Sequence, residues 1–287
     1  MATMKAIKKR ISSVNNTKKI MKAMDLVAAS KLQKARMRFE DVLPLYDNIK
    51  LVMDGIKASI RASDEVMFAE EREVKSIAYI VLTSDRGLCG SYNANVSKEA
   101  LACINANKDK QEKIIAIGAK GSDYFRRREK NVVLKYAGAS EATTFENAEA
   151  IGAQVASMYN SGEADEVYLV YTHFESILTH SPRVEKLLPI RAERSDDDSP
   201  VSVEMSYDPD VSTFISHAVP LYLKITIFGA MLESALCEYA SRMTSMDSAS
   251  RNASDIIEDL TLEFNRKRQG MITQEITEIV SGANALK

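Results

Sequence analysis

The stretch IKKRISSVNNTKKIMKAMDLVAASKLQKARMRF, residues 7–39, decides the fold, because mostly apolar positions recur along it at alternating spacings of four and three residues. The pattern continues to Ile60 and resumes from Phe214 to Leu260. A heptad repeat kept over this length is typical of a coiled coil. Its positions are Ile7, Ile11, Val14, Lys18, Met21, Asp25, Ala28, Leu32, Ala35, Phe39, Val42, Tyr46, Ile49, Met53, Ile56 and Ile60, then Phe214, Ala218, Leu221, Ile225, Phe228, Leu232, Ala235, Tyr239, Arg242, Met246, Ala249, Ala253, Ile256 and Leu260.

The two halves of the repeat are separated by a domain-sized insert, so we expect the chain to fold back into one long antiparallel two-helix coiled coil. If Ile60 lies opposite Phe214, then Ile7 lies opposite Lys267. From about residue 268 the C-terminal helix would continue alone for roughly 20 residues, which is roughly 30 Å of helix.

This predicted single-helix tip carries a group of apolar residues. Because an isolated helix that exposes such side chains gains little stability from packing, we expect the tip to lie inside a partner. A frayed tail is the alternative. The apolar residues are Met271, Ile272, Ile276, Ile279, Val280 and Leu286.

The composition of the 287 residues is typical of a soluble protein, with 27% charged and 45% hydrophobic residues. We find no run of 18 apolar residues and no apolar segment after the basic N-terminus, so we expect neither a membrane span nor a signal peptide. The three cysteines, Cys89, Cys103 and Cys237, are too few and too far apart for a disulfide framework or a zinc site. We therefore predict a cytosolic protein.

Positive charge is concentrated in residues 5–38, where eleven basic residues face Asp25 alone, for a local charge of +10. A helical stripe of this kind indicates an acidic partner such as nucleic acid, anionic lipid or an acidic protein surface. A simply solvated helix face is the alternative. The basic residues are Lys5, Lys8, Lys9, Arg10, Lys18, Lys19, Lys22, Lys31, Lys34, Arg36 and Arg38.

The middle of the chain alternates short β-branched runs with helical segments, which predicts a central Rossmann-like α/β domain with mostly parallel strands. We divide the chain into an N-terminal coiled-coil helix (1–62), the α/β domain (75–205) and a C-terminal coiled-coil helix (208–287). Expected strands are 76–84, 113–118, 131–136, 166–171 and an edge strand at 183–190; expected helices are 93–107, 122–129 and 145–159.

Proline sets limits on the two long helices. Pro44 falls within the N-terminal repeat, where we expect a local bend and not two separate helices. After Pro220 the chain contains no further proline, which permits one helix of roughly 70 residues.

The residues give little support to a catalytic function. Ser84–Ser91 (SDRGLCGS) and Gly118–Ser122 (GAKGS) follow strands, but neither contains a recognised phosphate-binding motif. Cys89 is a possible nucleophile beside Arg86, although no histidine is tied to it by spacing. We therefore predict no catalytic residues, no cofactor and no metal, and keep a phosphate-using enzyme as a minor alternative.

Several motifs along the whole chain resemble the gamma subunit of F-type ATP synthases. The most specific is ITQEITEIVSGANA, residues 272–285, whose pattern is an Ile/Val-Thr-x-Glu core followed by an acidic residue and Gly-Ala. Met21 stands where the family usually has threonine, and a paired-cysteine insertion typical of chloroplast relatives is missing, which favours a bacterial type. The other motifs are RISSVNNTKKIMKAM (10–24), SDRGLCG (84–90), SRMTSM (241–246) and NRKRQ (265–269).

The resemblance implies a non-catalytic central rotor shaft that couples ion flow through the membrane sector to ATP synthesis or hydrolysis. In that family the shaft enters a hexamer of alpha and beta subunits, and the catalytic sites lie on the beta subunits. The α/β domain contacts the epsilon subunit and the membrane ring of c subunits, at the cytoplasmic face of the cell membrane. The alternative from a different class is a basic coiled coil that binds nucleic acid, which the resemblance does not support.

The resemblance also implies roles for individual positions. Met24 and Arg242 would lie near acidic loops of the beta subunits, and Arg268 and Gln269 would engage a beta subunit nearer the tip. Tyr207 and Asp208 resemble the foot of the rotor near the c-ring. Ordinary packing or solvation is the alternative for each position. Three further residues belong to the C-terminal signature and would support the tip contact: Thr273, Glu275 and Glu278.

Overall fold

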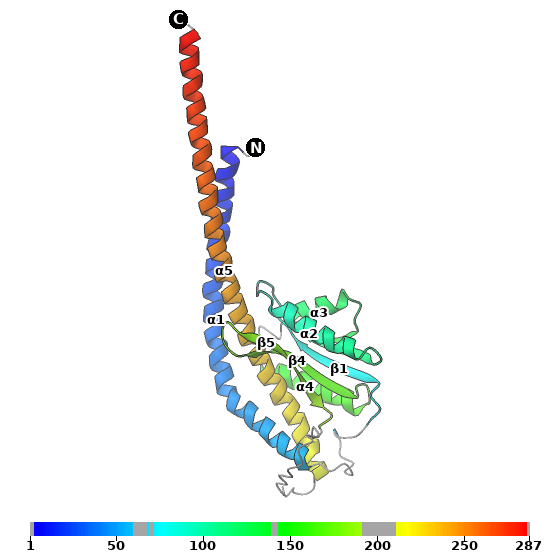
Figure 1. Cartoon of the computed structure of the whole chain (residues 1–287). Helices are drawn as coiled ribbons and strands as arrows, with labels where there is room; N and C mark the ends of the chain where they lie inside the picture. Colours follow the sequence, from blue (N-terminus) through cyan, green and yellow to red (C-terminus); the bar gives the residue numbers. More distant parts are fainter. Residues whose placement is uncertain (1–2, 60–67, 69–71, 139–142, 191–210, 286–287) are drawn as a thin grey trace, which may run out of the picture. The chain divides into compact units, whose positions relative to one another are not determined.

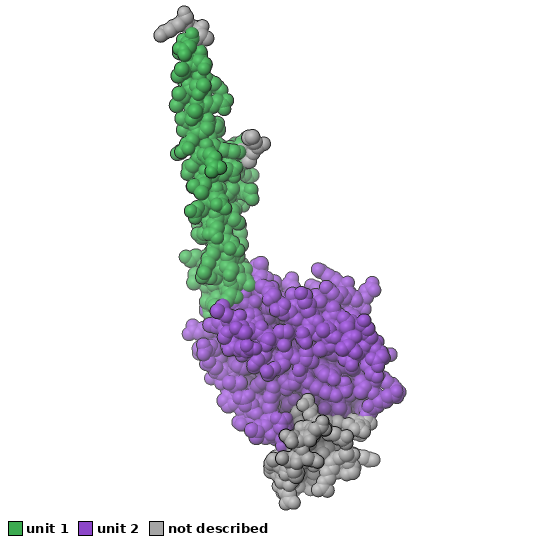
Figure 2. All heavy atoms as spheres, in the orientation of Figure 1, with its two compact units in different colours: residues 1–29, 242–287 green, residues 30–241 purple. Residues whose placement is uncertain are grey.

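The computed structural model describes residues 3–59, 68, 72–138, 143–190 and 211–285. These residues form two compact units, which Figure 2 shows in different colours. Unit 1 combines residues 1–29 with residues 242–287, and unit 2 comprises residues 30–241. Two long helices contribute to both units: α1 (Met4–Ser59) and α5 (Val211–Ala285).

Unit 2 is built on a five-stranded sheet with the order β3-β2-β1-β4-β5. The first four strands in that order are parallel, and β5 pairs antiparallel with β4 at the edge. The predicted Rossmann-like arrangement with an edge strand near Arg183 is therefore confirmed. The strands are β1 (Ser76–Leu82), β2 (Gln111–Ile117), β3 (Val132–Tyr136), β4 (Glu166–Phe174) and β5 (His180–Leu188).

Helices cover both faces of the sheet (Figure 1). One face packs against α2 (Tyr92–Ala106) and α3 (Ala119–Arg126) around a core that includes Val96 and Phe125. The other face packs against α4 (Phe145–Asn160), the first half of α5 and the end of α1. Because both faces are buried, the central strands read as continuous apolar runs.

The sequence places α3 three residues too late, at residues 122–129. The helix begins earlier because Asp85 Oδ1 accepts a hydrogen bond from the Ala119 amide, and Thr83 Oγ1 accepts one from the Gly121 amide. It ends earlier because the chain leaves the helix through a turn in which Glu129 has φ 56°. Both ends of α3 are therefore set by side-chain hydrogen bonds and backbone conformation. The hydrophobic periodicity of the sequence carries no information about either.

The heptad positions of α1 face inward as predicted, because each one between Ile7 and Ile56 is buried or half-buried. In unit 1, Ile7 and Ala28 are buried on α1, and Met246, Ala253 and Leu260 are buried on α5. Three predicted positions of α5 are wrong, since the side chains of Phe214, Leu221 and Ile256 are exposed.

Pro44 and Pro220 both lie inside continuous helices. Within unit 2, α1 passes through Pro44 without a break and curves along its second half, as expected (Figure 1). Helix α5 begins before Pro220 and extends over 75 residues, slightly longer than predicted.

One window of α5 is long and apolar enough to cross a membrane by composition alone, and 61% of it is buried inside the protein. The first half of α5 belongs to the core cluster on the sheet, with Ile215, Leu223 and Ile227 fully buried. A helix that is apolar on all sides is typical of a protein core as well as of a membrane.

Candidate functional site

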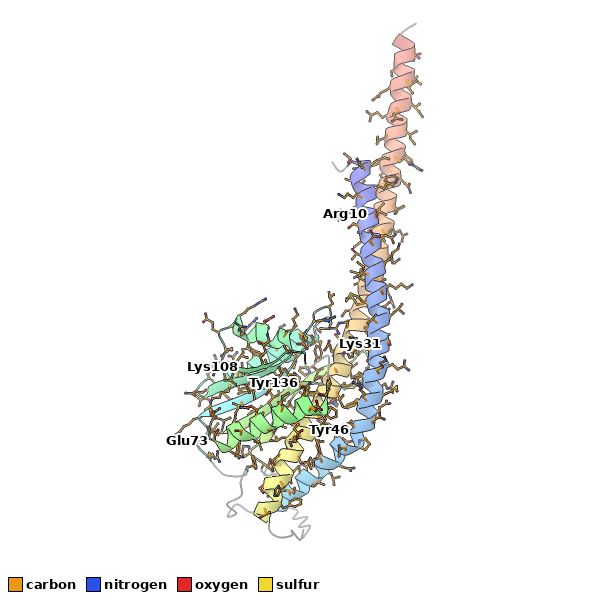
Figure 3. All side chains as sticks on the ribbon, turned by 180° about the vertical axis from the view of Figure 1, so that it is seen from behind. Arg10, Lys31, Tyr46, Glu73, Lys108 and Tyr136 are labelled. Carbon is orange, nitrogen blue, oxygen red and sulfur yellow. The ribbon has the colours of Figure 1, made fainter. Side chains whose placement is uncertain are left out.

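The end of α5 forms an unpaired helical tip in unit 1. Residues 268–284 are exposed at every position, whereas Lys267 is half-buried. Figure 3 shows α5 continuing past the first turn of α1, which begins above Arg10. The exposed run begins one residue after Lys267, the position that the heptads place opposite Ile7.

The tip exposes large apolar side chains that the described residues do not cover. Ile279 is 71% exposed, and the other apolar side chains of the tip are about half exposed. Isolated helices of this length are marginally stable in water, so burial in a partner would supply the stabilising packing that the tip lacks. The remaining members of this group are Met271, Ile272, Ile276 and Val280.

Polar contacts within the tip are local. Thr273 Oγ1 donates to the Gln269 carbonyl at 3.0 Å, Thr277 Oγ1 donates to the Thr273 carbonyl at 2.8 Å, and Gln274 Nε2 donates to Glu278 Oε1 at 2.9 Å. A side-chain pair such as Gln274 and Glu278 stabilises a helix by only about 0.2–0.5 kcal/mol, and threonine hydroxyls bonded to the carbonyl four residues earlier do not add to helix stability. These side chains therefore remain largely available to a partner.

The structure separates the predicted contact residues into groups. Arg268, Gln269, Thr273, Glu275 and Glu278 share the exposed tip. A second group, Met24 and Arg242, is half-buried in the paired section of unit 1. Tyr207 and Asp208 lie outside the described residues.

The basic stripe of α1 is solvent-exposed at every basic position from Lys5 to Arg38 except Lys18, which is half-buried. Arg36 pairs with Glu40 at 2.8 Å, and Lys31 Nζ lies 5.5 Å from the centroid of the Tyr239 ring. Figure 3 labels Arg10 and Lys31 on this helix. Such exposed cations can form ion pairs with an acidic surface, and each exposed ion pair contributes only about 0–1 kcal/mol of binding free energy.

The α/β unit has the topology of a nucleotide-binding fold, in which ligands bind beyond the carboxyl ends of the parallel strands. Here the chain's own atoms fill that position. Asp85 occupies the N-terminus of α3, and the Ser241 hydroxyl of α5 donates to the Cys89 carbonyl at 2.7 Å. The cavity between the strand ends, Tyr92 and α5 measures about 10 Å³, room for about one water molecule.

Cys89 does not resemble an activated nucleophile. Its side chain is 2% exposed, and its sulfur accepts a hydrogen bond from Asn93 Nδ2 at 3.1 Å. A thiol buried in the structure in this way is normally inert. Within the described ranges, no group of three His, Cys, Asp or Glu residues could hold a metal ion.

A buried polar face of α5 is the feature that sequence reasoning missed. Residues 229–241 are buried at every position, and this segment includes Glu233, Ser234, Glu238 and Ser241. Burial raises the pKa of the Glu233 carboxyl, and the Phe174 amide and His173 oppose that increase. The sequence signal that could have revealed this face is the pair of acidic residues, Glu233 and Glu238, in a mainly apolar run. A buried carboxylate needs specific polar partners, so such a pair predicts polar contacts inside the core.

Comparisons with known proteins agree on one family. A family model described as ATP synthase matches residues 3–286. The ATP synthase gamma chain of Alkaliphilus metalliredigens is 42% identical over 99% of both chains, and that of Desulforamulus reducens is 41% identical over 100% of both. The sodium ion specific ATP synthase gamma chain of Acetobacterium woodii is 39% identical over 98% of this chain and 97% of its own.

Solved structures share the fold. A chain of the Euglena gracilis mitochondrial ATP synthase rotor matches with a TM-score of 0.68 and 15% identity, over 94% of this chain and 98% of that chain. A chain of the Tetrahymena thermophila mitochondrial ATP synthase central stalk and c-ring matches with a TM-score of 0.59 and 24% identity, over 80% and 99% respectively.

Proposed function

The chain belongs to the gamma-chain family of ATP synthases, and from that membership we propose that it is the rotating central stalk of such an enzyme. The exposed apolar tip of α5 is the structural observation that carries the proposal. A rotor must present one end to a surrounding partner, and residues 268–284 lack any partner among the described residues of this chain.

We infer that the catalytic sites lie on the beta subunits and that this chain changes their conformations in turn. A partner shifts a conformational equilibrium only by contacting its states with different affinity. Helices α1 and α5 present different side chains, because the basic stripe lies on α1 and the exposed apolar tip lies on α5. Rotation would therefore offer each beta subunit a different surface and exchange their nucleotide affinities.

The exposed residues suggest how contacts are distributed along the shaft. The basic stripe, together with Met24 and Arg242, would meet acidic loops of the beta subunits, where weak exposed ion pairs push without arresting rotation. At the tip, Arg268 and Gln269 would engage a beta subunit, and their exposure supports that role. Thr273, Glu275 and Glu278 would support this tip contact.

The α/β unit would face the membrane sector. Tyr207 and Asp208, at the predicted foot, would contact the c-ring, and the epsilon subunit would bind nearby. This arrangement makes the chain a peripheral protein at the cytoplasmic face of the cell membrane, where ion flow turns the ring and the shaft together.

The decisive experiment is co-expression of this chain with the alpha and beta subunits of the same organism, followed by native mass spectrometry and an ATPase assay. We expect a complex of three alpha, three beta and one copy of this chain that hydrolyses ATP. A folded chain that remains unbound would contradict the proposal. Duplex DNA titrated at several salt concentrations would then test the basic stripe for nucleic-acid binding.

A further inference from the structure

The buried segment of α5 meets the α/β sheet through a row of directional polar contacts. The Phe174 amide donates to Glu233 Oε1 at 3.0 Å, and the Ser241 hydroxyl donates to the Cys89 carbonyl at 2.7 Å. Between them, Thr172 makes two longer contacts of 3.5 Å: its amide donates to Ser234 Oγ, and its carbonyl accepts from Cys237 Sγ.

A close contact between a histidine and the Glu233 carboxyl adds to the row. His173 Nδ1 lies 2.6 Å from Glu233 Oε1 without hydrogen-bond geometry, and Glu233 is only 2% exposed. All of these groups belong to unit 2, and Ser241 is the last residue of that unit. The row, which we call the α5 polar strip, consists of Glu233, Ser234, Cys237 and Ser241.

The strip restrains motions that apolar packing alone would permit. Hydrophobic contacts are non-directional, so an apolar helix can turn about its axis with gradual changes in burial. Hydrogen bonds weaken steeply when donor and acceptor lose their alignment. A rotation of α5 about its axis would leave the Glu233 carboxylate and the strand-end amides buried and unpaired, which is unfavourable for both.

We propose that the α5 polar strip fixes the rotational setting of α5 on the α/β sheet, so that helix and sheet turn as one body when torque acts on them. This inference rests on the proposed rotor function. In this role Glu233 and Ser241 are positioning residues. The crevice that other proteins of this topology use for a nucleotide serves here as the socket for the chain's own helix.

The test measures torsional stiffness in the complete complex with alpha and beta subunits. The hexamer is fixed to a surface, and a bead is attached at Lys98→Cys, an exposed position of α2, in a Cys103→Ser background. Rotation is arrested with a non-hydrolysable ATP analogue, and the angular variance of the bead is recorded. Glu233→Ala combined with Ser241→Ala removes three of the five contacts described above.

We expect the double variant to increase the angular variance about twofold, because the contacts act as parallel angular restraints. Glu233→Gln keeps an acceptor for the Phe174 amide and should remain close to the unsubstituted chain. The matched control, Glu163→Ala with Ser157→Ala, makes the same substitutions at exposed positions of the same unit and should leave the variance unchanged.

The outcomes separate this inference from the rotor function. Complex formation and ATP hydrolysis test the rotor function, and angular variance tests the strip. A double variant that assembles and shows the variance of the control would overturn the inference. If the double variant does not assemble, Ser241→Ala alone decides the matter: an increased variance supports the strip, and an unchanged variance refutes it.

Discussion

Residues 229–241 and residues 268–284 belong to the same helix, yet every residue of the first segment is buried and every residue of the second is exposed. The first segment is enclosed by α1 on one side and the sheet on the other. Its Gly229 lies against the Tyr46 ring, and its Ser241 bonds to the Cys89 carbonyl. Within the described part of the chain, the second segment makes local contacts between residues four apart, such as Thr273 to Gln269.

The difference shows that one continuous helix can have two sources of stability. Residues 229–241 receive their packing from the chain itself, so substitutions there should affect the isolated chain. Residues 268–284 expose apolar side chains, so substitutions there should affect assembly and leave the isolated chain nearly unchanged. Each prediction below tests that division.

Removal of residues 268–287 should produce the largest effect. We expect binding to a hexamer of alpha and beta subunits to weaken at least about tenfold, which corresponds to about 1.4 kcal/mol. The free energy of unfolding of the isolated chain should change by no more than about 0.5 kcal/mol, because residues 268–284 are exposed at every position. Native mass spectrometry and urea denaturation measure the two quantities. Equal losses in both would contradict the division.

The same substitution at two points of α5 should have unequal results. Ile227 is fully buried in the core against the sheet, whereas Ile276 is 56% exposed. Ile227→Ala should reduce the free energy of unfolding by about 2–5 kcal/mol, because it removes buried apolar atoms and leaves a cavity. Ile276→Ala should change it by less than about 0.5 kcal/mol. Comparable losses in urea denaturation of the isolated chain would show that the tip has an internal partner.

Two glycines of α5 extend the comparison to the backbone. A Cβ atom at Gly229 would lie 2.5 Å from the Tyr46 ring, whereas one at Gly270 would meet nothing within 4 Å. Gly229→Ala should therefore destabilise by about 1–3 kcal/mol through overpacking. Gly270→Ala should stabilise by about 0.5–1 kcal/mol through helix propensity. Thermal unfolding of both variants gives the sign of each change in stability. A stabilising effect of Gly229→Ala would refute the close contact between α1 and α5 at Tyr46.

The exposed segment could be predicted from the sequence because it depends on one periodic pattern. Alternating spacings of three and four identify the face of α1 that meets α5, and counting from Ile60 and Phe214 places the end of the pair at Lys267. The central strands were predictable from composition, because β1 is a continuous run of buried residues and β2 and β4 are buried over much of their length.

The buried segment could not be predicted in the same way, because it has two partners. The heptad repeat identifies the face of α5 that packs against α1. Contacts with the sheet join residues far apart in sequence, such as Ser241 and Cys89, and have no such repeat. The second partner also explains why Leu221 is exposed although it keeps the repeat, while Leu223 and Ile227 are buried against the sheet. The start of α3 depended likewise on Asp85, 34 residues before Ala119.

The smallest effect concerns the dependence of stability on pH. Burial raises the pKa of Glu233 above its ordinary value, and the nearby groups that lower it include His173 and Lys50. A carboxyl with a raised pKa in the folded state contributes stability that is present below its unfolded pKa and is lost as the pH rises through its folded pKa. The folded chain should therefore lose part of its stability in that window.

Glu233→Gln should remove this component, because an amide does not titrate, while an acceptor for the Phe174 amide is retained. The difference in free energy of unfolding between the unsubstituted chain and the variant should therefore move in favour of the variant as the pH increases above the ordinary range for glutamate. Glu275→Gln in the exposed tip serves as the matched control and should run parallel to the unsubstituted chain. Urea denaturation at a series of pH values measures both differences. If Glu233→Gln also ran parallel, the charge of Glu233 would be fully compensated in its buried position, and the contrast between the two segments of α5 would rest on packing alone.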